Sequence, residues 1–489
     1  MLRPSHPTPR LLSEVLGEVE GLQLSGDAAL TVTVTGCTHD SRAVLPGDLY
    51  AALPGAHAHG ADFAEQALAA GAVAVLTDPD GAARVAGVPV LVAAAPRSVL
   101  GDVASWVHGH PSRDLTVLGV TGTNGKTTTA FLLEAGLQAA GHATGLLGTV
   151  VTRIGDEAVP SVRTTPEATD LHTLFAVMRE RGVDAVAMEV SSHALRYGRV
   201  DGVRFDVAAF TNLSQDHLDF HADMEDYFAA KASLFTPERS ARGVVYADDP
   251  YGRRLLDAQR IPLQGFGSGA DWQAVDIVLR ADGSSFRLVG PRTDIPASVR
   301  LPGAFNVSNA LAALSALVSA GIPVDAAVAG VAALPGVPGR MERVDAGQPF
   351  AALVDYAHTP DAVETLLASV REVTTGRVIV VLGCGGDRDR TKRPLMGRAA
   401  VQGADLAVFT SDNPRSEDAG AILDEMGDGW AHRDTDRRAA IAWAVAQAQP
   451  GDTVVVAGKG HESGQDVGGV VTPFDDRDVL RSALDEVLS

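Results

Sequence analysis

Short apolar runs recur along most of the chain, and segments with helical patterning separate them. Runs of this kind, rich in Val, Ala and Leu, are typical of strands that are buried on both faces of a parallel sheet. Because parallel strands need long crossover connections, the pattern predicts an α/β fold. We expect strands at Ala72–Leu76, Val88–Val92, Thr116–Val120, Asp184–Met188, Val207–Phe210, Gly243–Tyr246, Ala352–Asp355, Arg377–Leu382, Leu406–Thr410 and Thr453–Ala457.

Two segments depart from this rhythm. Residues Ala274–Val299 tend to alternate apolar and polar side chains around the turn Ala281–Ser284, which predicts an antiparallel hairpin. The Ala-rich stretch Asn309–Val324 is interrupted by two serines and a glycine. It is too short and too interrupted to cross a bilayer, so we expect a buried helix there.

The length of the chain predicts more than one domain. A chain of 489 residues exceeds what one hydrophobic core supports, and usual domain sizes argue for about three. Composition shifts at His108–Arg113 and at the Gly/Pro-rich Pro335–Arg343. We therefore predict domains at 1–110, 111–340 and 341–489.

Charge and cysteine content narrow the class of protein. Lys and Arg total 40 against 61 Asp and Glu, and the net charge of −21 disfavours binding to nucleic acid and to anionic membranes. The two cysteines, Cys37 and Cys384, have no CxxC partner and fit a reducing compartment. Met1–Arg10 lacks the apolar core of a signal peptide, and no apolar run is long enough to span a membrane. We expect a cytoplasmic protein.

The segment Thr116–Thr129 has the pattern of a strand, a glycine-rich loop and a helix start. Backbone N–H groups of such a loop bind phosphate oxygens together with the helix N-terminus. Lys126 would reach the β- and γ-phosphates of a nucleotide, and Thr127 would offer its hydroxyl to Mg²⁺. Val120 replaces the usual first glycine, so the alternative is a Gly-rich turn with a chance Lys-Thr. The predicted loop contacts are Gly122, Thr123, Asn124, Gly125, Lys126, Thr127 and Thr128.

Acidic and histidine side chains follow two later strands. Glu189 comes directly after the predicted strand Asp184–Met188, at the edge where α/β sheets bind ligands. Its carboxylate suits Mg²⁺, and a buried Glu satisfied by backbone groups is the alternative. Thr211–His221 holds two His and two Asp within six residues. Without cysteine and zinc-like spacing, this segment does not predict a zinc site.

The string Thr-Gly-Thr-Asn-Gly-Lys-Thr at the loop resembles the ATP-binding loop of the Mur ligases and of their relative folylpolyglutamate synthetase. Further Mur ligase motifs follow in order along nearly the whole chain. The resemblance implies a small N-terminal UDP-binding α/β domain, a central P-loop ATPase-type domain with a parallel sheet, and a Rossmann-like C-terminal domain. It also implies an enzyme that needs ATP and two Mg²⁺ ions, and we expect a monomer.

By this resemblance, His217 contacts a metal and Lys231 is carbamylated by CO₂. A carbamate turns a cation into a fixed anion that can hold a second Mg²⁺. Without the resemblance, an exposed helix lysine is the more frequent interpretation of Lys231. The implied catalytic residues are Lys126, Lys231, His217 and Glu189, and the implied metal contacts are Thr127, Glu189, His217 and Lys231.

Four more residues match nucleotide-contacting positions of the family. Asn306 and Arg340 are implied nucleotide contacts, and their alternatives are a helix cap and a surface ion pair. Asp355 and His358 lie in the string Asp-Tyr-Ala-His-Thr-Pro, which in the family closes over ATP and would exclude water.

The third domain carries the motifs that bear on substrate choice. The basic loop Gly383–Pro394 predicts an anion site, with a solvated loop as the alternative. The string Asp-Asn-Pro-Arg matches the motif of diaminopimelate-adding members, although Asn-Pro also favours a turn. Arg415, helped by Arg388, would bind the carboxylate that lysine lacks, and Glu462 would pair with the distal ammonium. The implied amino-acid contacts are Arg388, Asp412, Asn413, Pro414, Arg415, Gly458 and Glu462.

The remaining matches concern the UDP-muramoyl end of a substrate. His39 and Ser41 lie in Thr-His-Asp-Ser-Arg-Ala, which resembles the uridine-binding part of the family, with a capped turn as the alternative. The turn His57–Gly60 would add backbone contacts. The family often has Gln where this chain has Tyr197, which changes the reach of that contact. The implied contacts to the muramoyl peptide are Arg163, Thr164, Thr165, Ser191, Tyr197 and Arg199.

The resemblance implies the ATP-dependent addition of meso-2,6-diaminopimelate to the D-glutamate of UDP-N-acetylmuramoyl-L-alanyl-D-glutamate, through an acyl phosphate, in peptidoglycan precursor synthesis. Other possibilities are the same ligation with L-lysine or another diamino acid, and a ligase like folylpolyglutamate synthetase. A plain P-loop ATPase or GTPase and a non-catalytic nucleotide-binding protein are the rivals outside the ligases.

Overall fold

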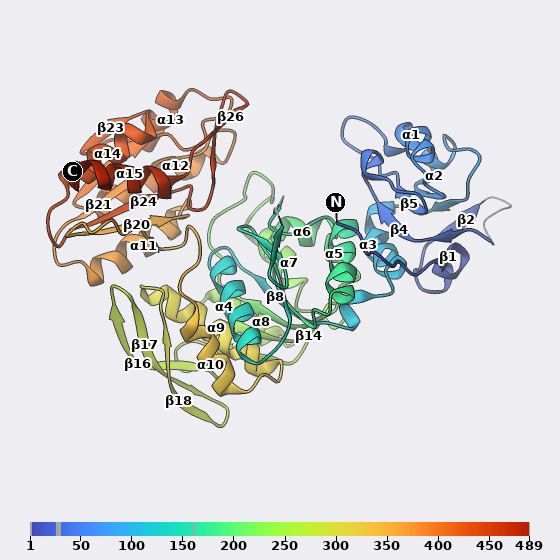
Figure 1. Cartoon of the computed structure of the whole chain (residues 1–489), viewed down its shortest axis with the longest axis horizontal. Coiled ribbons are helices and arrows are strands. Elements are labelled where there is room, and N and C mark those ends of the chain that lie inside the picture. The colour runs from blue at the N-terminus through green and yellow to red at the C-terminus, as the bar shows by residue number, and fades with distance from the viewer. Residues whose placement is uncertain (1, 26–30, 160, 162, 489) are drawn as a thin grey trace.

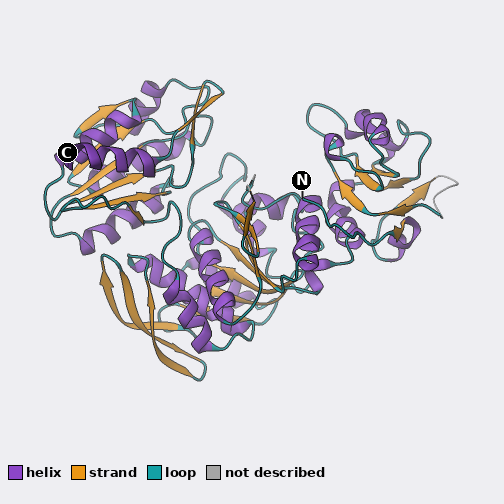
Figure 2. Cartoon of the chain, in the orientation of Figure 1, coloured by secondary structure: helices purple, strands orange, loops and turns teal. Residues whose placement is uncertain are grey.

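Three sheet-centred regions follow one another along the chain. A computed structural model describes residues 2–25, 31–159, 161 and 163–488. The N-terminal region, in blue, and the C-terminal region, in orange and red, lie on either side of the central one (Figure 1). Helices accompany the strands in each region (Figure 2), so the predicted α/β class is confirmed. Among the described residues, no helix is both long enough and apolar enough to cross a membrane.

The N-terminal region is built on a five-stranded sheet in the order β2-β7-β6-β5-β4. β4 to β7 are parallel, and β2 pairs antiparallel with β7 at one edge. The elements are β1 Arg10–Leu11, η1 Leu12–Gly17, β2 Gln23–Ser25, β3 Thr33–Val34, β4 Gly36–Thr38, η3 Ser41–Ala43, β5 Asp48–Ala51, η4 Gly60–Phe63, α1 Ala64–Ala69, β6 Ala74–Thr77, α2 Pro79–Ala82, β7 Val90–Val92, α3 Pro96–Val107 and η5 Pro111–Arg113.

The central region has an eight-stranded sheet in the order β11-β10-β9-β12-β8-β13-β14-β15. The strands from β9 to β15 in this order are parallel, and only the pairings of β10 with β9 and with β11, at one edge, are antiparallel. The elements are β8 Thr116–Thr121, α4 Lys126–Ala139, β9 Thr144–Leu147, β10 Thr152–Ile154, β11 Glu157–Val159, α5 Ala168–Glu180, β12 Ala185–Glu189, α6 Ser192–Arg196, β13 Phe205–Phe210, α7 Met224–Ala232, β14 Ser240–Tyr246, α8 Pro250–Ala258 and β15 Leu263–Phe266.

An antiparallel sheet and two helices complete the central region. The predicted hairpin is confirmed as β16 and β17, and a third strand, β18, extends it. The predicted helix at Asn309–Val324 is wrong at its ends, because α9 begins at Ala304 and ends at Ser319, where a short turn leads into α10. The elements are β16 Gln273–Arg280, β17 Gly283–Gly290, β18 Thr293–Val299, α9 Ala304–Ser319 and α10 Val324–Ala333.

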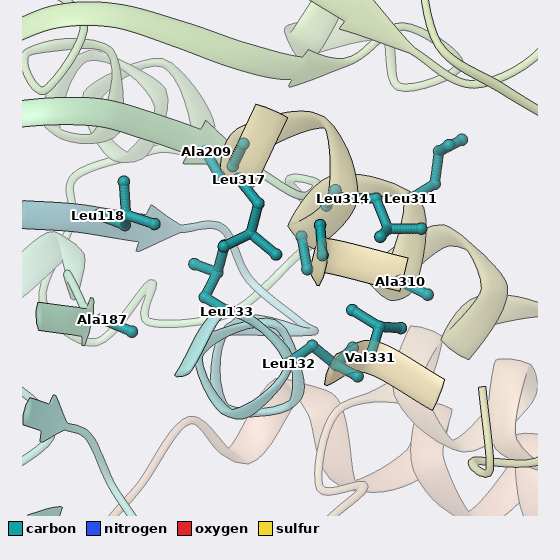
Figure 3. Close-up of a cluster of buried hydrophobic side chains, with 14 of the residues drawn as sticks. Leu118, Leu132, Leu133, Ala187, Ala209, Ala310, Leu311, Leu314, Leu317 and Val331 are labelled. Carbon is teal, nitrogen blue, oxygen red and sulfur yellow. The ribbon is translucent and has the colours of Figure 1, made fainter. Parts of the chain in front are cut away.

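Helices cover both faces of the central sheet, which explains why its strands are continuously apolar. On one face α4, α9 and α10 pack against β8, β12 and β13 (Figure 3). Leu118, Leu133 and Leu317 in this cluster are fully buried, and each such leucine contributes roughly 1.5–3 kcal/mol. The opposite face carries a second cluster that includes Phe175 on α5 and Tyr227 on α7.

The C-terminal region is built on a six-stranded sheet in the order β19-β20-β24-β21-β22-β23, parallel except at β19. Two hydrophobic clusters cover its faces. The elements are β19 Glu342–Arg343, β20 Ala351–Asp355, α11 Pro360–Val373, β21 Val378–Leu382, η6 Arg390–Lys392, α12 Arg393–Gly403, β22 Leu406–Thr410, α13 Ala419–Met426, β23 His432–Asp434, α14 Arg437–Gln447, β24 Thr453–Ala457, β25 Gly464–Val467, β26 Val470–Pro473 and α15 Asp476–Leu488.

The strand orders determine which loops meet. In the central sheet β8 lies between β12 and β13, so the residues after these three strands gather at one edge. In the C-terminal sheet the ends of β20, β24, β21 and β22 are brought together in the same way. Ligands of open α/β sheets bind at such carboxyl edges. The two edges therefore hold most of the candidate site residues.

Candidate active site

A cavity of about 640 Å³ lies between the carboxyl edge of the central sheet and the C-terminal region. This volume is in the range of sites for small molecules. Predicted residues from several separate motifs line it, and they are Thr123, Asn124, Gly125, Lys126, Thr127, Thr128, Glu189, His217, Lys231, Arg340, Asp355 and His358, together with Thr164 and Ser191.

The glycine-rich loop joins β8 to α4 as the sequence predicts. Gly125 precedes the helix with φ of 87°, a left-handed conformation that favours glycine. Lys126 folds back over the loop, and its Nζ donates to the carbonyl oxygens of Gly122 at 2.9 Å and Thr123 at 2.8 Å. Burial lowers the pKa of Lys126, while the charge of Glu189 opposes this shift.

The residues after β13 hold the loop in place. The backbone N–H of Asn124 donates to Oδ1 of Asn212 at 2.9 Å, and Thr211 Oγ1 donates to the Asn124 carbonyl at 2.6 Å. The Asn124 side chain also reaches the C-terminal region, where its Nδ2 donates to Asp361 Oδ2 on α11 at 3.1 Å. The loop is thus tied to both sides of the cavity.

Lys231 on α7 is buried beneath the same loop. Its side chain is 1% exposed, so the interpretation as an exposed helix lysine is wrong. Its Nζ donates to the Gly122 carbonyl at 2.7 Å and lies 4.5 Å from the centre of the Tyr227 ring. Burial holds the pKa of Lys231 well below its ordinary value, and the nearby charge of Lys126 lowers it further. Its amine therefore loses a proton more readily than that of an exposed lysine.

Glu189 ends β12 and is buried, with both carboxylate oxygens used. Thr149, after β9, donates its backbone N–H to Oε1 at 2.7 Å and its hydroxyl to Oε2 at 3.1 Å. Glu189 is therefore buried and accepts a backbone hydrogen bond, as the alternative interpretation predicts. Its carboxylate also lies on the cavity wall. Thr149 was not predicted, because the short strand β9 that positions it was not predicted either.

His217 lies in a strained turn beside other polar rings. It adopts φ of 55°, in the left-handed region. Its Nε2 is 3.4 Å from Asp216 Oδ2, and its ring meets the His193 ring edge to face at 4.8 Å. Burial lowers the pKa of His217 to about 3, against the opposing charge of Asp216. A neutral imidazole of this kind has a free nitrogen lone pair that can bind a metal.

The donors along the cavity fit Mg²⁺ in the presence of phosphate. Within the described residues, no group of three or more His, Cys, Asp and Glu side chains is close enough to hold a metal alone. Mg²⁺ normally takes one or two protein carboxylates, keeps several waters and uses phosphate oxygens for the rest. Glu189 and the Thr127 hydroxyl on the same wall supply donors of that type.

The predicted nucleotide contacts divide into two groups. Arg340 reaches across the cavity, where its Nη2 donates to Thr127 Oγ1 at 3.1 Å and its guanidinium lies 4.0 Å from the Tyr356 ring centre. Asn306 lies behind the wall and accepts from Nδ2 of Asn309 at 2.9 Å. Asn309, which the sequence did not single out, lines the cavity in its place.

The Asp355 segment forms the C-terminal wall of the cavity. Asp355 ends β20 and accepts the backbone N–H groups of Met341 and Ala357, each at 2.8 Å. Burial raises its pKa, although the charge of Arg340 opposes the shift. His358 turns its Nδ1 to the carbonyl oxygen of Tyr356 at 2.8 Å. Asp355 therefore shapes the turn that brings Tyr356 and His358 to the cavity.

The predicted muramoyl-peptide contacts form a polar wall beside β12. Thr165 donates its hydroxyl to the Glu189 carbonyl at 2.9 Å and accepts the backbone N–H of Ser191 at 3.1 Å. Arg199 pairs with Glu167 at 2.8 Å, and Arg163 lies 3.9 Å from the same carboxylate. The sequence did not single out Glu167 as the residue that holds these arginines. The Tyr197 side chain is exposed, and its ring centre is 5.7 Å from the Arg199 guanidinium.

His39 and Ser41 lie apart from the cavity, in the N-terminal region. His39 Nδ1 is 2.9 Å from Thr169 Oγ1 on α5, so this contact joins the N-terminal and central regions. Ser41 begins η3 and donates its hydroxyl to Gln66 Oε1 at 3.2 Å. The His57–Gly60 turn ends in a capping box made by His59 and Asp62.

The two motifs of the C-terminal region form a second polar cluster. Asn413 Nδ2 donates to Glu462 Oε2 at 2.8 Å, so the string Asp-Asn-Pro-Arg at 412–415 meets the segment Gly458–Glu462. Arg415 has φ of 50°, and its Nη1 donates to the Gly386 carbonyl at 2.5 Å. Asp412 and Pro414 are buried, whereas Arg388 is exposed on the Gly383–Pro394 loop.

The second cluster borders the first cavity through Tyr356. Tyr356 lines the cavity, and the ring of His461 lies 5.2 Å from the Tyr356 ring. A Cβ on Gly460 would come within 2.8 Å of the Tyr356 Cβ. Burial raises the pKa of Tyr356 to about 12, and the negative charge of Glu462 adds to the shift. The cavity and the second cluster therefore lie next to each other, with Tyr356 between them.

Known families match all three regions. Models described as Mur ligase family, catalytic domain, as Mur ligase middle domain and as Mur ligase, glutamate ligase domain match residues 33–105, 120–317 and 339–460. A UDP-N-acetylmuramoyl-L-alanyl-D-glutamate–2,6-diaminopimelate ligase from Streptomyces avermitilis is 58% identical over 501 residues, covering 99% of this chain and 98% of that protein.

The chain belongs to the Mur ligase family.

Two further relatives place this Mur ligase within the family. A UDP-N-acetylmuramyl-tripeptide synthetase from Leifsonia xyli subsp. xyli is 46% identical over 504 residues, covering 99% of this chain and 98% of that protein. A solved structure of a UDP-N-acetylmuramoyl-L-alanyl-D-glutamate–2,6-diaminopimelate ligase superposes with a TM-score of 0.69 at 33% identity, covering 99% of this chain and 100% of that one. The resemblance stated from the sequence is confirmed, including its three-region fold.

Proposed function

We propose that this Mur ligase uses ATP to join meso-2,6-diaminopimelate to the D-glutamate of UDP-N-acetylmuramoyl-L-alanyl-D-glutamate. One observation carries the proposal. The phosphate loop, Glu189 and Lys231 form one wall of a cavity, and the cluster of Asn413 and Glu462 borders that cavity through Tyr356. Such an arrangement brings a nucleotide-activating site next to a site for a charged amino acid. Relatives named for this reaction at up to 59% identity support it.

The phosphate loop and the opposite wall of the cavity would bind ATP. The N–H groups of Gly122–Thr128 and the start of α4 would hold the phosphates. Lys126, now bound to loop carbonyls, would swing to the β- and γ-phosphates. Arg340 and Asn309 would flank the nucleotide, with Asp355 shaping the C-terminal wall. Asn306 would act from behind, by orienting Asn309.

Thr127, Glu189, His217 and a carbamylated Lys231 would hold two Mg²⁺ ions. When bound, Mg²⁺ neutralises charge on the transferring phosphoryl group. The environment of Lys231 supports carbamylation, because a neutral amine is the form that attacks CO₂. The carbamate would replace a cation with an anion, and Tyr227 together with the Gly122 carbonyl would position it. An acceptor carbonyl at 2.7 Å suits an amine or a carbamate N–H equally.

The proposed ligation has two steps. The D-glutamate side-chain carboxylate attacks the γ-phosphorus of ATP, the bond to the β–γ bridging oxygen breaks, and ADP leaves. The amine of the amino acid then attacks the acyl carbon, the acyl–oxygen bond to phosphate breaks, and the amine loses a proton. Both steps rest on positioning and on stabilising phosphate charge, so no side-chain nucleophile is needed.

Recognition of the amino acid would come from the second cluster. Arg415 has one nitrogen bound to the Gly386 carbonyl, and the rest of its guanidinium can bind the distal carboxylate of diaminopimelate. Arg388 on the neighbouring loop would assist. Glu462 would bind the distal ammonium. Asp412, Pro414 and Gly458 shape the turn around them.

The other substrate would extend towards the N-terminal region. His39 and Ser41 would contact uridine, and Arg163, Thr164, Thr165, Ser191, Tyr197 and Arg199 would contact the muramoyl peptide and its phosphates. This assigns UDP binding to residues 1–110, ATP binding to 111–340 and amino-acid binding to 341–489. We propose that the enzyme acts as a monomer, and the two free, buried cysteines support a cytoplasmic location.

Phosphate release tests the proposed function. Purified enzyme is given ATP, Mg²⁺ and UDP-muramoyl-dipeptide, and then meso-diaminopimelate, lysine or ornithine in separate reactions. We expect phosphate release and tripeptide product with meso-diaminopimelate, and much less with the other two. Release that is independent of both the dipeptide and the amino acid would indicate a plain ATPase and contradict the proposal.

A further inference from the structure

The second cluster contains a buried cation to which no role has been assigned so far. Lys459 has no exposed surface, although it lies only three residues before the partly exposed Glu462. Burying an ammonium is costly unless hydrogen-bond acceptors and an opposite charge compensate it. A lysine is therefore retained in such a place only where its partners are well defined.

The ammonium of Lys459 has two such partners. Its Nζ donates to Asn413 Oδ1 at 3.0 Å and to Glu462 Oε2 at 3.1 Å. Asn413 and Glu462 are also joined directly, through the 2.8 Å bond from Nδ2 to Oε2. The three side chains form a closed triangle that links the segment after β22 with the segment after β24.

Among the residues that the structure describes, none donates a hydrogen bond to the second oxygen of Glu462. Both hydrogen bonds to Glu462 end on Oε2, and the side chain is 34% exposed. Oδ1 of Asn413 accepts a second hydrogen bond, from the backbone N–H of Asp466 at 3.0 Å, and this bond fixes the orientation of the amide. Oε1 of Glu462 therefore remains for a cationic ligand, with the carboxylate held at a fixed angle.

The backbone around Lys459 is shaped to bury it. The Glu462 N–H donates to the Lys459 carbonyl at 3.0 Å, which closes a tight turn. Gly460 within that turn has φ of 55°, and a Cβ there would lie 2.7 Å from the Gly339 carbonyl. Only glycine fits this close approach, and the resulting turn directs the lysine side chain inwards to Asn413.

We propose that Lys459 is a positioning residue for the amino-acid substrate, acting through Glu462 and Asn413. This inference rests on the proposed function, because it takes Glu462 as the partner of the distal ammonium. Lys459 orients the carboxylate before the substrate arrives, which lowers the conformational entropy lost on binding. It contacts no part of the substrate itself.

Lys459 and Arg415 should therefore affect different parts of amino-acid recognition. Every diamino acid has a distal ammonium, whereas only diaminopimelate has the distal carboxylate assigned to Arg415. Loss of Lys459 should therefore weaken the binding of meso-diaminopimelate and of lysine by similar factors. Loss of Arg415 should weaken diaminopimelate alone. A general disturbance of the C-terminal region would instead also affect ATP, because Asp355 and His358 line the nucleotide cavity.

Steady-state kinetics of Lys459→Met, Lys459→Gln and Arg438→Met provide the test. Methionine keeps the length of the side chain without a donor, glutamine keeps a donor, and Arg438 is an exposed cation of the same region. For Lys459→Met we expect the KM for meso-diaminopimelate to rise by about tenfold or more, the cost of losing a charge-assisted hydrogen bond. The KM values for ATP and for the dipeptide should stay within about twofold of wild type. Lys459→Gln should recover part of the loss, and Arg438→Met should behave as wild type.

Each outcome has a separate meaning. An unchanged KM for diaminopimelate in Lys459→Met would overturn the inference, as would a parallel rise in all three KM values. A loss that affects diaminopimelate but spares lysine would also overturn it. If Lys459→Met does not fold, Lys459→Gln decides by the same criteria. A wild-type enzyme that accepts no diamino acid would instead overturn the proposed function, so the two failures are distinguishable.

Discussion

The Nζ of Lys231 on α7 lies 2.7 Å from the carbonyl oxygen of Gly122, 109 residues earlier in the chain. This bond joins the two segments that carry the phosphate loop and the proposed carbamate. It also explains the burial of Lys231, since the loop and the Tyr227 ring cover its amine. A lysine held in this way is neutral more readily than an exposed one, because its pKa is depressed by burial and by Lys126.

Lys231→Ala should abolish ligation while leaving the fold intact. The variant removes the amine that would react with CO₂, and with it the anion proposed to hold Mg²⁺. We expect the rate of phosphate release to fall by about a thousandfold or more, in line with the loss of a charge-stabilising group. The measurement is coupled phosphate release at saturating substrates.

Mass spectrometry and rescue control this prediction. Native mass spectrometry in bicarbonate buffer should detect an adduct of one CO₂ on the wild type and none on Lys231→Ala. Added short-chain carboxylic acids should partly restore activity to the variant, because they can supply the missing carboxylate. Wild-type activity in Lys231→Ala would contradict the assignment.

Lys126→Ala should eliminate product formation but have less effect on the affinity for the UDP-muramoyl-dipeptide. Its ammonium is proposed to move from the carbonyls of Gly122 and Thr123 to the nucleotide phosphates. Removing this counter-ion should lower kcat/KM for ATP by about a hundredfold or more. Isothermal titration separates the effects, since dipeptide affinity should stay near wild type. Turnover close to that of wild type would refute the role of Lys126.

Arg415→Ala should change the choice of amino acid. Its guanidinium is fixed by a left-handed backbone and by the Gly386 carbonyl, at the place where a distal carboxylate would lie. We expect the KM for meso-diaminopimelate to rise by about ten- to a hundredfold and the KM for ATP to stay nearly constant. Competition between diaminopimelate and lysine measures the change directly. Equal effects on both amino acids would remove the specificity argument.

The sequence predicted the central strands well because their burial leaves a strong signal. The predicted run Leu406–Thr410 coincides with β22, and Thr453–Ala457 coincides with β24. The strands that were missed, such as β10 at Thr152–Ile154, are short and lie at an edge, where hydrogen bonding to a neighbour decides the conformation rather than an apolar run. Such strands cannot be told from loops by local patterning.

The sequence predicted those site residues that come directly after a strand and belong to a recognisable sequence motif. Lys126, Glu189 and Asp355 all line the cavity. Thr149, which supports Glu189, carries no local signal, because its partner is distant in sequence. Thr149 is 40 residues from Glu189 along the chain. Only the tertiary contact identifies this position.

A buried ion pair connects the stability of the C-terminal region to its site. Arg437 on α14 makes a two-point contact with Asp476, and both side chains have no exposed surface. The same guanidinium donates to the carbonyls of Ser411 and Ala457, at the ends of β22 and β24. Those two strands lead directly into the segments that form the second cluster.

Asp476→Asn should therefore destabilise this region strongly. Removing one charge of a buried pair leaves the other uncompensated and typically costs about 3–5 kcal/mol. Urea unfolding followed by circular dichroism should give a lower free energy of unfolding by this amount. Asp478→Asn, a change at an exposed position in the same helix, is the matched control and should have an effect of less than about 1 kcal/mol. Similar effects of the two variants would contradict the role of the pair.

Glu417 should make the stability of the same region depend on pH in a defined direction. Hydrogen bonds from Arg393 and from the Asp387 N–H lower the pKa of Glu417 from 4.5 to about 2. A carboxylate with a depressed folded-state pKa stabilises the protein above its unfolded-state pKa, and this contribution is lost as pH falls through the folded-state pKa. Glu417→Gln removes the ionisable group but keeps its shape.

At pH 7 we expect Glu417→Gln to have a lower Tm than wild type, because the buried Arg393 loses a charged partner. The Tm difference should narrow as pH falls from about 4.5 towards 2, where the wild-type carboxylate becomes protonated as well. Differential scanning calorimetry of both proteins across this pH range measures the Tm difference. Groups that titrate in both proteins contribute equally and cancel from this difference. A Tm difference that stays constant down to pH 2 would mean that Glu417 does not titrate as its contacts predict.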